Sequence, residues 1–298
     1  MDQRRAAIAA AGVTVVLWAS AFVGIRAAAP YFSPGALALG RLGAGAVTLL
    51  VFLLARREGL PPRAAWPGIV ASGILWFGFY MVVLNWGERE VDAGTAAMVV
   101  NVGPIIMALL AGWVLREGFP PRLLGGILVS CCGAVVVGVS LSGGGRSSVL
   151  GVVLCLLAAI SYAAGAVAQK PALRHASALQ VTTYGCVIGL VVCLPFAGRL
   201  AAEVAGAPAH ITLTVVYLGV FPTAIAFTTW AYAMARTTAG KMGSTTYLVP
   251  VVVIVISALV LHEVPAPLAI LGGVLCLAGV AVSRGGRAPA AVEPVTRR

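Results

Sequence analysis

Residues 93–117 read AGTAAMVVNVGPIIMALLAGWVLRE, and residues 239–263 read AGKMGSTTYLVPVVVIVISALVLHE. A shift of 146 residues places Pro104 on Pro250 and Glu117 on Glu263, with Ala-Gly at the start of both stretches. Chance matches are expected among the abundant Ala, Val and Gly, but the matched prolines and the matched glutamate are rare types here. The pattern predicts a chain built from two duplicated units.

The composition around these stretches is that of a membrane protein. The 298 residues are 60% hydrophobic and only 10% charged, with a mean hydropathy of +1.02, whereas soluble domains are about half apolar and a quarter charged. Ten apolar stretches are each long enough to cross roughly 30 Å of hydrocarbon. They must be helical, because backbone groups in lipid are paired within the segment. The predicted spans are residues 6–28, 34–55, 66–87, 93–115, 121–141, 149–170, 178–197, 211–235, 241–261 and 266–283.

Charge in the connections predicts the orientation. With a cytoplasmic amino terminus, fifteen Lys and Arg residues fall inside, and Arg26, Arg89, Arg146 and Arg199 fall outside. The positive-inside rule therefore places both termini in the cytoplasm. Because each unit has five helices, the second unit enters the membrane from the opposite side. The predicted fold is an all-α integral membrane protein of ten transmembrane helices in two inverted repeats, residues 1–145 and 146–284, with a disordered basic tail at 285–298.

Inverted repeats of this kind are characteristic of transporters, because two equivalent halves can exchange conformations around a central site. The net charge of +11 is spread between the spans and forms no basic face with interleaved aromatics, so nucleic acid is not an expected partner. We find no catalytic or phosphate-binding motif, and the three histidines lie in separate connections. The sequence therefore predicts no enzyme, no cofactor and no metal site.

Several features resemble one known family. They are the stretch Trp18-Ala19-Ser20-Ala21-Phe22, Arg41 in the second span, the Pro104 and Pro250 helices that end in glutamate, and the glycine-rich fifth and tenth spans. Together they resemble the EamA branch of the drug/metabolite transporter superfamily, and within it the aromatic amino-acid exporters of the YddG type. The resemblance implies that spans 1, 3, 4, 6, 8 and 9 line a central cavity and that spans 5 and 10 are peripheral.

Candidate cavity residues are the polar and aromatic side chains at mid-depth in these spans. Asn101 and Tyr247 superpose in the repeat, three residues before the paired prolines, where proline frees a backbone carbonyl. Arg41 lies roughly 10 Å below the interface and is interpreted either as a carboxylate anchor or as a structural link between helices. Pro104 and Pro250 are interpreted as hinges, the alternative being static kinks. The candidate set is Trp18, Ser20, Phe22, Trp76, Tyr80, Asn85, Met98, Asn101, Ser161, Tyr162, Thr228, Trp230, Ser244 and Tyr247.

The acidic residues suggest how transport is driven. None of the nine is expected deep in a span, whereas proton-coupled pumps typically keep a carboxylate there. This favours facilitated movement over proton exchange at a buried acid. Glu117 and Glu263 end spans 4 and 9, where they either form gating ion pairs or order a turn.

The expected cavity is aromatic and aliphatic with a few hydroxyls and amides. It suits export of aromatic or hydrophobic amino acids and related metabolites by alternating access. The alternatives are another metabolite or a drug-like solute, or, in a different class, a lipid-translocating or structural membrane protein. The 18 arginines against two lysines are typical of a GC-rich bacterium. We therefore expect a monomer in the bacterial inner membrane, with the bilayer and a small solute as its partners.

Overall fold

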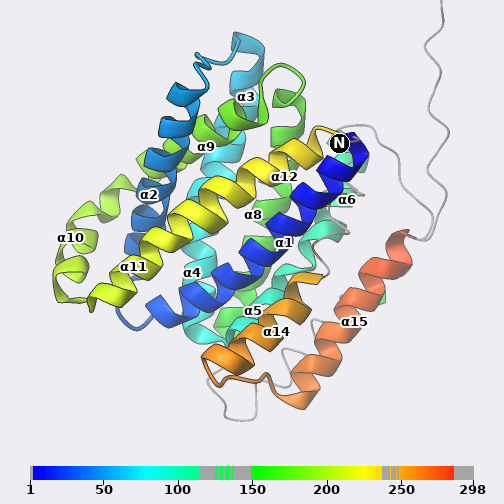
Figure 1. Ribbon diagram of the computed structural model, residues 1–298. Coiled ribbons are helices and arrows are strands. Elements are labelled where there is room, and N and C mark those ends of the chain that lie inside the picture. Colours follow the sequence, from blue (N-terminus) through cyan, green and yellow to red (C-terminus); the bar gives the residue numbers. More distant parts are fainter. Residues whose placement is uncertain are drawn as a thin grey trace, which may run out of the picture.

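The computed structural model describes residues 3–114, 149–236 and 248–284, together with 125–126, 128–129, 132–133, 136, 242 and 246. All regular structure in these residues is helical (Figure 1). The elements are α1 (Gln3–Ala28), α2 (Pro34–Ala55), η1 (Arg63–Ala65), α3 (Trp66–Ser72), η2 (Gly73–Phe79), α4 (Tyr80–Glu90), α5 (Ala93–Val100), α6 (Gly103–Val114), α8 (Val149–Ala172), α9 (Ala178–Cys193), η4 (Leu194–Phe196), α10 (Ala197–Gly206), α11 (Ala209–Leu218), η5 (Gly219–Ile225), α12 (Ala226–Met234), α14 (Leu248–Val260) and α15 (Pro267–Arg284).

Helix length and apolarity confirm a multi-pass membrane protein. Within the described residues, seven helical stretches are long and apolar enough to cross a membrane, and they coincide with seven predicted spans. Two shorter apolar helices, Leu248–Val260 and Ile270–Gly279, fall in the predicted ninth and tenth spans. The predicted span 121–141 lies mostly outside the described residues. The count of ten and the cytoplasmic termini therefore stay predictions.

The fourth span is broken in its middle. Asp92 caps the start of α5 by accepting a hydrogen bond from the Thr95 backbone N–H at 2.8 Å, as N-cap residues do. The helix then ends at Val100, and α6 begins at Gly103, one residue before Pro104. Proline has no backbone N–H to continue the ladder of the preceding turn. The predicted break therefore exists, and it places Asn101 in the turn between the two half-helices.

Pro250 takes a similar place in the second repeat, since Pro104 is the second residue of α6. Pro250 is the third residue of α14, which is described from Leu248 onward. Proline is well tolerated in a first helical turn, where the N–H groups lack an intrahelical partner. In the described residues both prolines thus lie in the first turn of a helix, and the predicted hinge at Pro250 stays a prediction.

Two π-helical segments reveal the repeat in the backbone. Each is seven residues long: η2 spans Gly73–Phe79 and η5 spans Gly219–Ile225, and their ends differ by the same 146 residues as the sequence repeat. Pro222 lies inside η5, whereas Trp76 takes the equivalent place in η2. Proline is therefore not what makes these segments π-helical. Such segments are rare and frequent at functional sites.

Each π-helical segment packs closely on a helix of the other half. η5 packs on α2 and η2 packs on α9. A Cβ added to Gly219 would lie 2.5 Å from the Arg41 carbonyl oxygen, and one added to Gly189 would lie 2.4 Å from the Phe77 Cβ. Small residues permit this approach of helices. The Gly185-x-x-x-Gly189 pattern is thus a packing feature.

The first helix of each half packs against the other half. α1 packs against α12 and α14 of the second half, while α8 packs against α4 and α6 of the first half, and Figure 1 shows α1 running beside α12. The central space is therefore enclosed by elements from both repeats.

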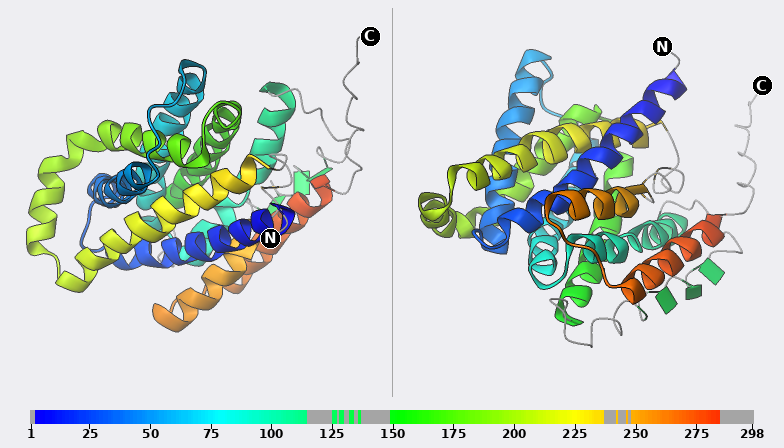
Figure 2. Two further views of the ribbon diagram at one scale, coloured as in Figure 1. Left: turned by 45° about the horizontal axis from the view of Figure 1, so that its top comes forward. Right: turned by 60° about the horizontal axis from the view of Figure 1, so that its bottom comes forward.

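The periphery differs from the prediction in one place. The span predicted to end at residue 197 continues through η4 into α10, which ends at Gly206 and buries none of its residues. Pro195 stands at the start of η4, where it is tolerated, so the helical stretch bends and continues. α10 and α15 lie on opposite sides of the bundle in the views of Figures 1 and 2.

Candidate solute-binding site

A cavity lies between the two halves of the bundle. Its lining comes from six of the predicted lining spans and, in addition, from Arg41 of the second span. The lining residues are Trp18, Ala21, Phe22, Ile25, Arg41, Tyr80, Leu84, Val100, Asn101, Pro104, Tyr162, Phe227, Thr246 and Val249.

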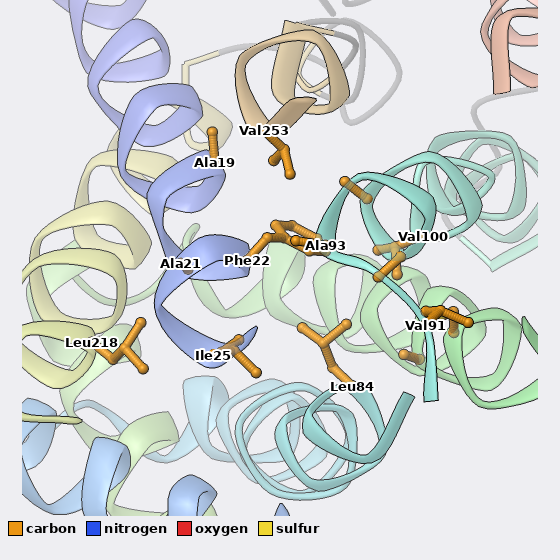
Figure 3. Close-up of a cluster of buried hydrophobic side chains, with 14 of the residues drawn as sticks. Ala19, Ala21, Phe22, Ile25, Leu84, Val91, Ala93, Val100, Leu218 and Val253 are labelled. Carbon is orange, nitrogen blue, oxygen red and sulfur yellow. The ribbon is translucent and has the colours of Figure 1, made fainter. Parts of the chain in front are cut away.

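One part of the wall is apolar, with one aromatic and several aliphatic side chains. Phe22 and Ile25 of α1, Leu84 of α4 and Val100 of α5 point into the space between these helices (Figure 3). They belong to a larger cluster of buried apolar side chains. The transfer of apolar solute surface from water to this wall favours binding by roughly 25 cal/mol of free energy per Å².

Arg41 is the one cation among the lining residues, and it is held from one side only. It is 2% exposed, and its Nε donates to the Thr223 hydroxyl oxygen at 2.7 Å. The Thr223 hydroxyl in turn donates to the Leu218 carbonyl at the end of α11. The Arg41 Nη1 is buried and has no hydrogen-bond partner. A buried donor left unpaired costs free energy, so this guanidinium is fixed in place with one donor available to a ligand.

Asn101 complements Arg41 with a free acceptor. Its Nδ2 donates to the Thr246 carbonyl at 3.0 Å, which links the broken fourth span to the second half. Its Oδ1 is buried without a hydrogen-bond partner. The identity of the two amide atoms follows from this network, since nitrogen is the atom that can donate to a carbonyl. The cavity therefore has both a fixed donor and a fixed acceptor.

A cluster of aromatic rings adjoins the cavity at Trp18. The Trp18 ring centroid lies 4.9 Å from that of Trp230, 5.4 Å from that of Phe227 and 6.0 Å from that of Trp76. Tyr162 joins the cluster at 5.4 Å from Trp76. These separations are within the range of favourable ring pairs. Trp76 and Trp230 are almost fully buried behind Trp18, Phe227 and Tyr162, so they support the lining instead of forming it.

Arg26 ties three elements together at the end of the bundle where α1 and α4 finish. Its Nε donates to both Glu263 carboxylate oxygens at 3.1 and 3.2 Å, and its Nη1 donates to the Glu88 carbonyl at 2.9 Å. One side chain thus links α1, the carboxyl end of α4 and the segment after α14. Glu263 forms the ion pair that was one of its two predicted roles, whereas Glu117 lies outside the described residues.

Glu88 is a carboxyl group that is buried within the protein near the end of α4. Its side chain is 0% exposed, and neither carboxyl oxygen has a hydrogen-bond partner. The sequence placed it just past the end of the third span, but α4 continues to Glu90 and packs against α8 and α2, which cover it. Glu88 lies two residues before the end of α4, so the expectation that no acid lies deep in a span, and with it the facilitated mechanism, stays a prediction.

The predicted site residues divide into three groups. Trp18, Phe22, Arg41, Tyr80, Asn101, Pro104 and Tyr162 line the cavity. Others are placed elsewhere by local contacts: the Ser20 and Tyr217 hydroxyls hydrogen-bond at 2.7 Å, Ser161 donates to the Leu75 carbonyl, Thr228 donates to the Ala224 carbonyl, Asn85 donates to the Pro34 carbonyl, and Met98 faces Gly273 of α15. Ser244 and Tyr247 lie outside the described residues.

Three important residues were missed. Phe227 and Thr246 line the cavity, and Thr223 holds Arg41. The 146-residue shift places Thr246 on Val100, but Val100 is known to line the cavity only from the structure, so the repeat alone did not mark Thr246. Nothing in the sequence pattern marks Thr223, whose role depends on how η5 crosses α2. Among the described residues no group of three or more His, Cys, Asp or Glu could hold a metal ion.

Apolar helices from two related halves, enclosing a cavity with a few fixed polar groups, define a multi-pass membrane transporter of a small solute. The chain belongs to the EamA-like transporter family, whose model matches residues 5–139 and again 149–285. It is 36% identical over 268 residues to a probable terminal-alkyne amino-acid exporter of Streptantibioticus cattleyicolor, with 90% of each chain covered.

Two further comparisons agree with this assignment. The chain is 34% identical to the uncharacterized transporter YdfC of Bacillus subtilis over 89% of this chain and 86% of that one. A solved crystal structure aligns with 94% of this chain and 98% of its own, with a TM-score of 0.66 and 20% identity. This last likeness shows the fold alone.

Proposed function

We propose that the protein exports amino acids with an aromatic or other unsaturated apolar side chain across the bacterial cytoplasmic membrane. The observation that carries this proposal is the pairing of a free Arg41 donor with a free Asn101 acceptor in one cavity. An α-amino acid presents the matching groups, a carboxylate and an ammonium, on one carbon atom.

In this proposal the solute carboxylate binds the Arg41 Nη1. Arginine is suited to carboxylates because its planar guanidinium presents several donors in a fixed geometry. The bond from Nε to Thr223 orients the plane before the solute arrives, which lowers the ordering cost of binding. The ammonium group donates to the Asn101 Oδ1, which its own bond to Thr246 holds in place.

The solute side chain lies against the rings of Trp18, Phe227 and Tyr162. Ring faces attract both aromatic side chains and flat unsaturated groups through contact area and the ring quadrupole. The relative from Streptantibioticus cattleyicolor supports this assignment, because its name describes an amino acid that carries an alkyne. Aromatic amino acids and alkyne amino acids share a zwitterionic head and an unsaturated apolar tail, and the cavity has a complement for each.

Alternating access would use the symmetry of the two halves. The broken fourth span and the two π-helical segments are places where helix geometry can change without unfolding. The Arg26–Glu263 ion pair closes one end of the bundle. In the predicted orientation, with both termini cytoplasmic, that end faces outward. The transporter acts as a monomer in this proposal.

Uptake into proteoliposomes tests the proposed chemistry with three probes of nearly equal size. L-Phenylalanine has both charged groups, phenethylamine lacks the carboxylate, and 3-phenylpropionate lacks the ammonium. We expect saturable uptake of L-phenylalanine and of L-propargylglycine, which carries a terminal alkyne. Neither truncated probe should be transported or compete. Equal transport of all three would exclude recognition of the amino-acid head group, and competition by unrelated metabolites alone would favour a different solute class.

A further inference from the structure

Glu88 is a buried carboxyl group that the solute site described above does not use. It lies on α4, two residues before the end of the helix, and its backbone carbonyl already accepts a hydrogen bond from Arg26. Both side-chain oxygens are buried and unpartnered. Burying an ionised carboxylate without a partner is among the most costly arrangements in a protein interior.

Charged and titratable groups on several neighbouring elements interact electrostatically with Glu88. The cations are Arg41 from α2 and Arg26 from α1, and the other acids are Asp92 at the start of α5 and Glu263 after α14. Tyr80 of its own helix and Cys155 of α8 complete the set. Arg26 is already engaged with Glu263 and two backbone carbonyls. Arg41 therefore is the cation with a donor to spare.

We propose that Glu88 is a proton-binding site, and that its ionised form competes with the solute carboxylate for the Arg41 guanidinium. This inference rests on the proposed function, because it takes Arg41 as the carboxylate anchor. With Glu88 protonated, Arg41 Nη1 is free for the solute, as in the present structure. When the carboxyl O–H bond breaks and the proton leaves to water at the Arg26 end, the resulting carboxylate attracts Arg41 and the solute binds less well.

The sign of the pH dependence follows from this competition. Solute binding removes Arg41 from Glu88, so binding favours the protonated carboxyl group. Solute affinity must then fall as the pH rises through the titration of Glu88 in the free protein. One linked proton gives about a tenfold loss of affinity per pH unit across that range.

The first experiment measures equilibrium binding of radiolabelled L-phenylalanine to the purified full-length protein from low to high pH. We expect the wild type to lose affinity with rising pH, and Glu88→Gln to bind as tightly at all pH values as the wild type does at low pH. Glu90→Gln is the matched control, since it lies on the same helix but is partly exposed, and it should keep the wild-type slope. A Glu88→Gln protein that keeps the wild-type slope would overturn the proposal.

Two further measurements complete the test. The first uses the wild type, so it does not depend on the folding of a variant. The second uses no solute, so it does not depend on the proposed solute. In the wild type, L-phenylalanine binding above the titration range should take up about one proton, detected with a pH indicator; no uptake contradicts the competition. Infrared difference spectra without solute should show a protonated carboxyl band in the wild type and in Glu90→Gln that Glu88→Gln lacks. If the band does not depend on Glu88, this inference is wrong even where solute binding at Arg41 is established. If L-phenylalanine does not bind at all, the proposed function fails, and with it the competition, whatever the infrared result.

Discussion

Substitution of Arg41 is the most direct test of how the solute is held. The guanidinium offers one unpaired donor, Nη1, and is oriented by its Nε bond to Thr223 at 2.7 Å. A hydrogen bond to a charged group contributes about 1.5–3 kcal/mol, which corresponds to about a 10- to 150-fold change in Kd. Arg41→Gln removes the charge and should fall near the upper limit. Arg41→Lys keeps a point charge but loses the planar fork, and should fall near the lower one.

The assay is equilibrium binding of radiolabelled L-phenylalanine at a pH low enough to keep Glu88 protonated. Arg56→Lys and Arg56→Gln are matched controls, because Arg56 follows the end of the same helix and is exposed. Size-exclusion profiles and thermal unfolding identify variants that have lost the fold. A folded Arg41→Gln protein with a Kd within twofold of the wild type would refute the assignment of Arg41 as the carboxylate anchor.

Three further predictions concern separate parts of the structure. Asn101→Leu should weaken L-phenylalanine binding by about 10- to 150-fold through loss of an acceptor for the ammonium; binding unchanged within twofold would remove Asn101 from the site. Gly219→Ala should destabilise the protein by about 1–3 kcal/mol, because its Cβ would lie 2.5 Å from the Arg41 carbonyl oxygen, whereas Gly12→Ala meets nothing within 4 Å; equal melting temperatures in the two variants would contradict the close packing of η5 on α2. Glu263→Gln should break the ion pair with Arg26 and speed the exchange of backbone amide hydrogens around residues 88–95. Amide exchange around residues 177–183 should not change. Unchanged exchange at both places would argue against a closure at the Arg26 end.

Much of the fold was predictable because the sequence contains regularly spaced apolar stretches and a repeat of 146 residues. Seven spans and the repeat could be read from hydropathy and from the paired prolines and glutamates. The break before Pro104 followed from the chemistry of proline alone. The π-helical form of residues 73–79 and 219–225 did not, although Gly73 and Gly219 were matched. That geometry depends on tight contacts with α9 and α2, which no local pattern encodes.

The site was less predictable, because depth along a span does not tell which way a side chain faces. Trp18, Arg41 and Asn101 line the cavity, but Ser20 and Met98 face α11 and α15. Glu88 shows the same difficulty in another form. Hydropathy placed it at the water interface, and only the packing of α2, α5 and α8 around the end of α4 buries it.

A small change of backbone geometry in either π-helical segment would alter the orientation of the helix that follows it. A π-turn holds one residue more than an α-turn, and one residue corresponds to about 100° of rotation around the axis. If η2 or η5 tightened to an α-helix, the following helix would turn by that angle relative to the part before it. Tyr80 and Phe227, each just beyond one of these segments, would leave the cavity wall and other side chains would replace them. Each half therefore contains a segment whose change from π-helix to α-helix would rotate the following helix about its own axis. This rotation would change the side chains around the solute without moving the helix axes.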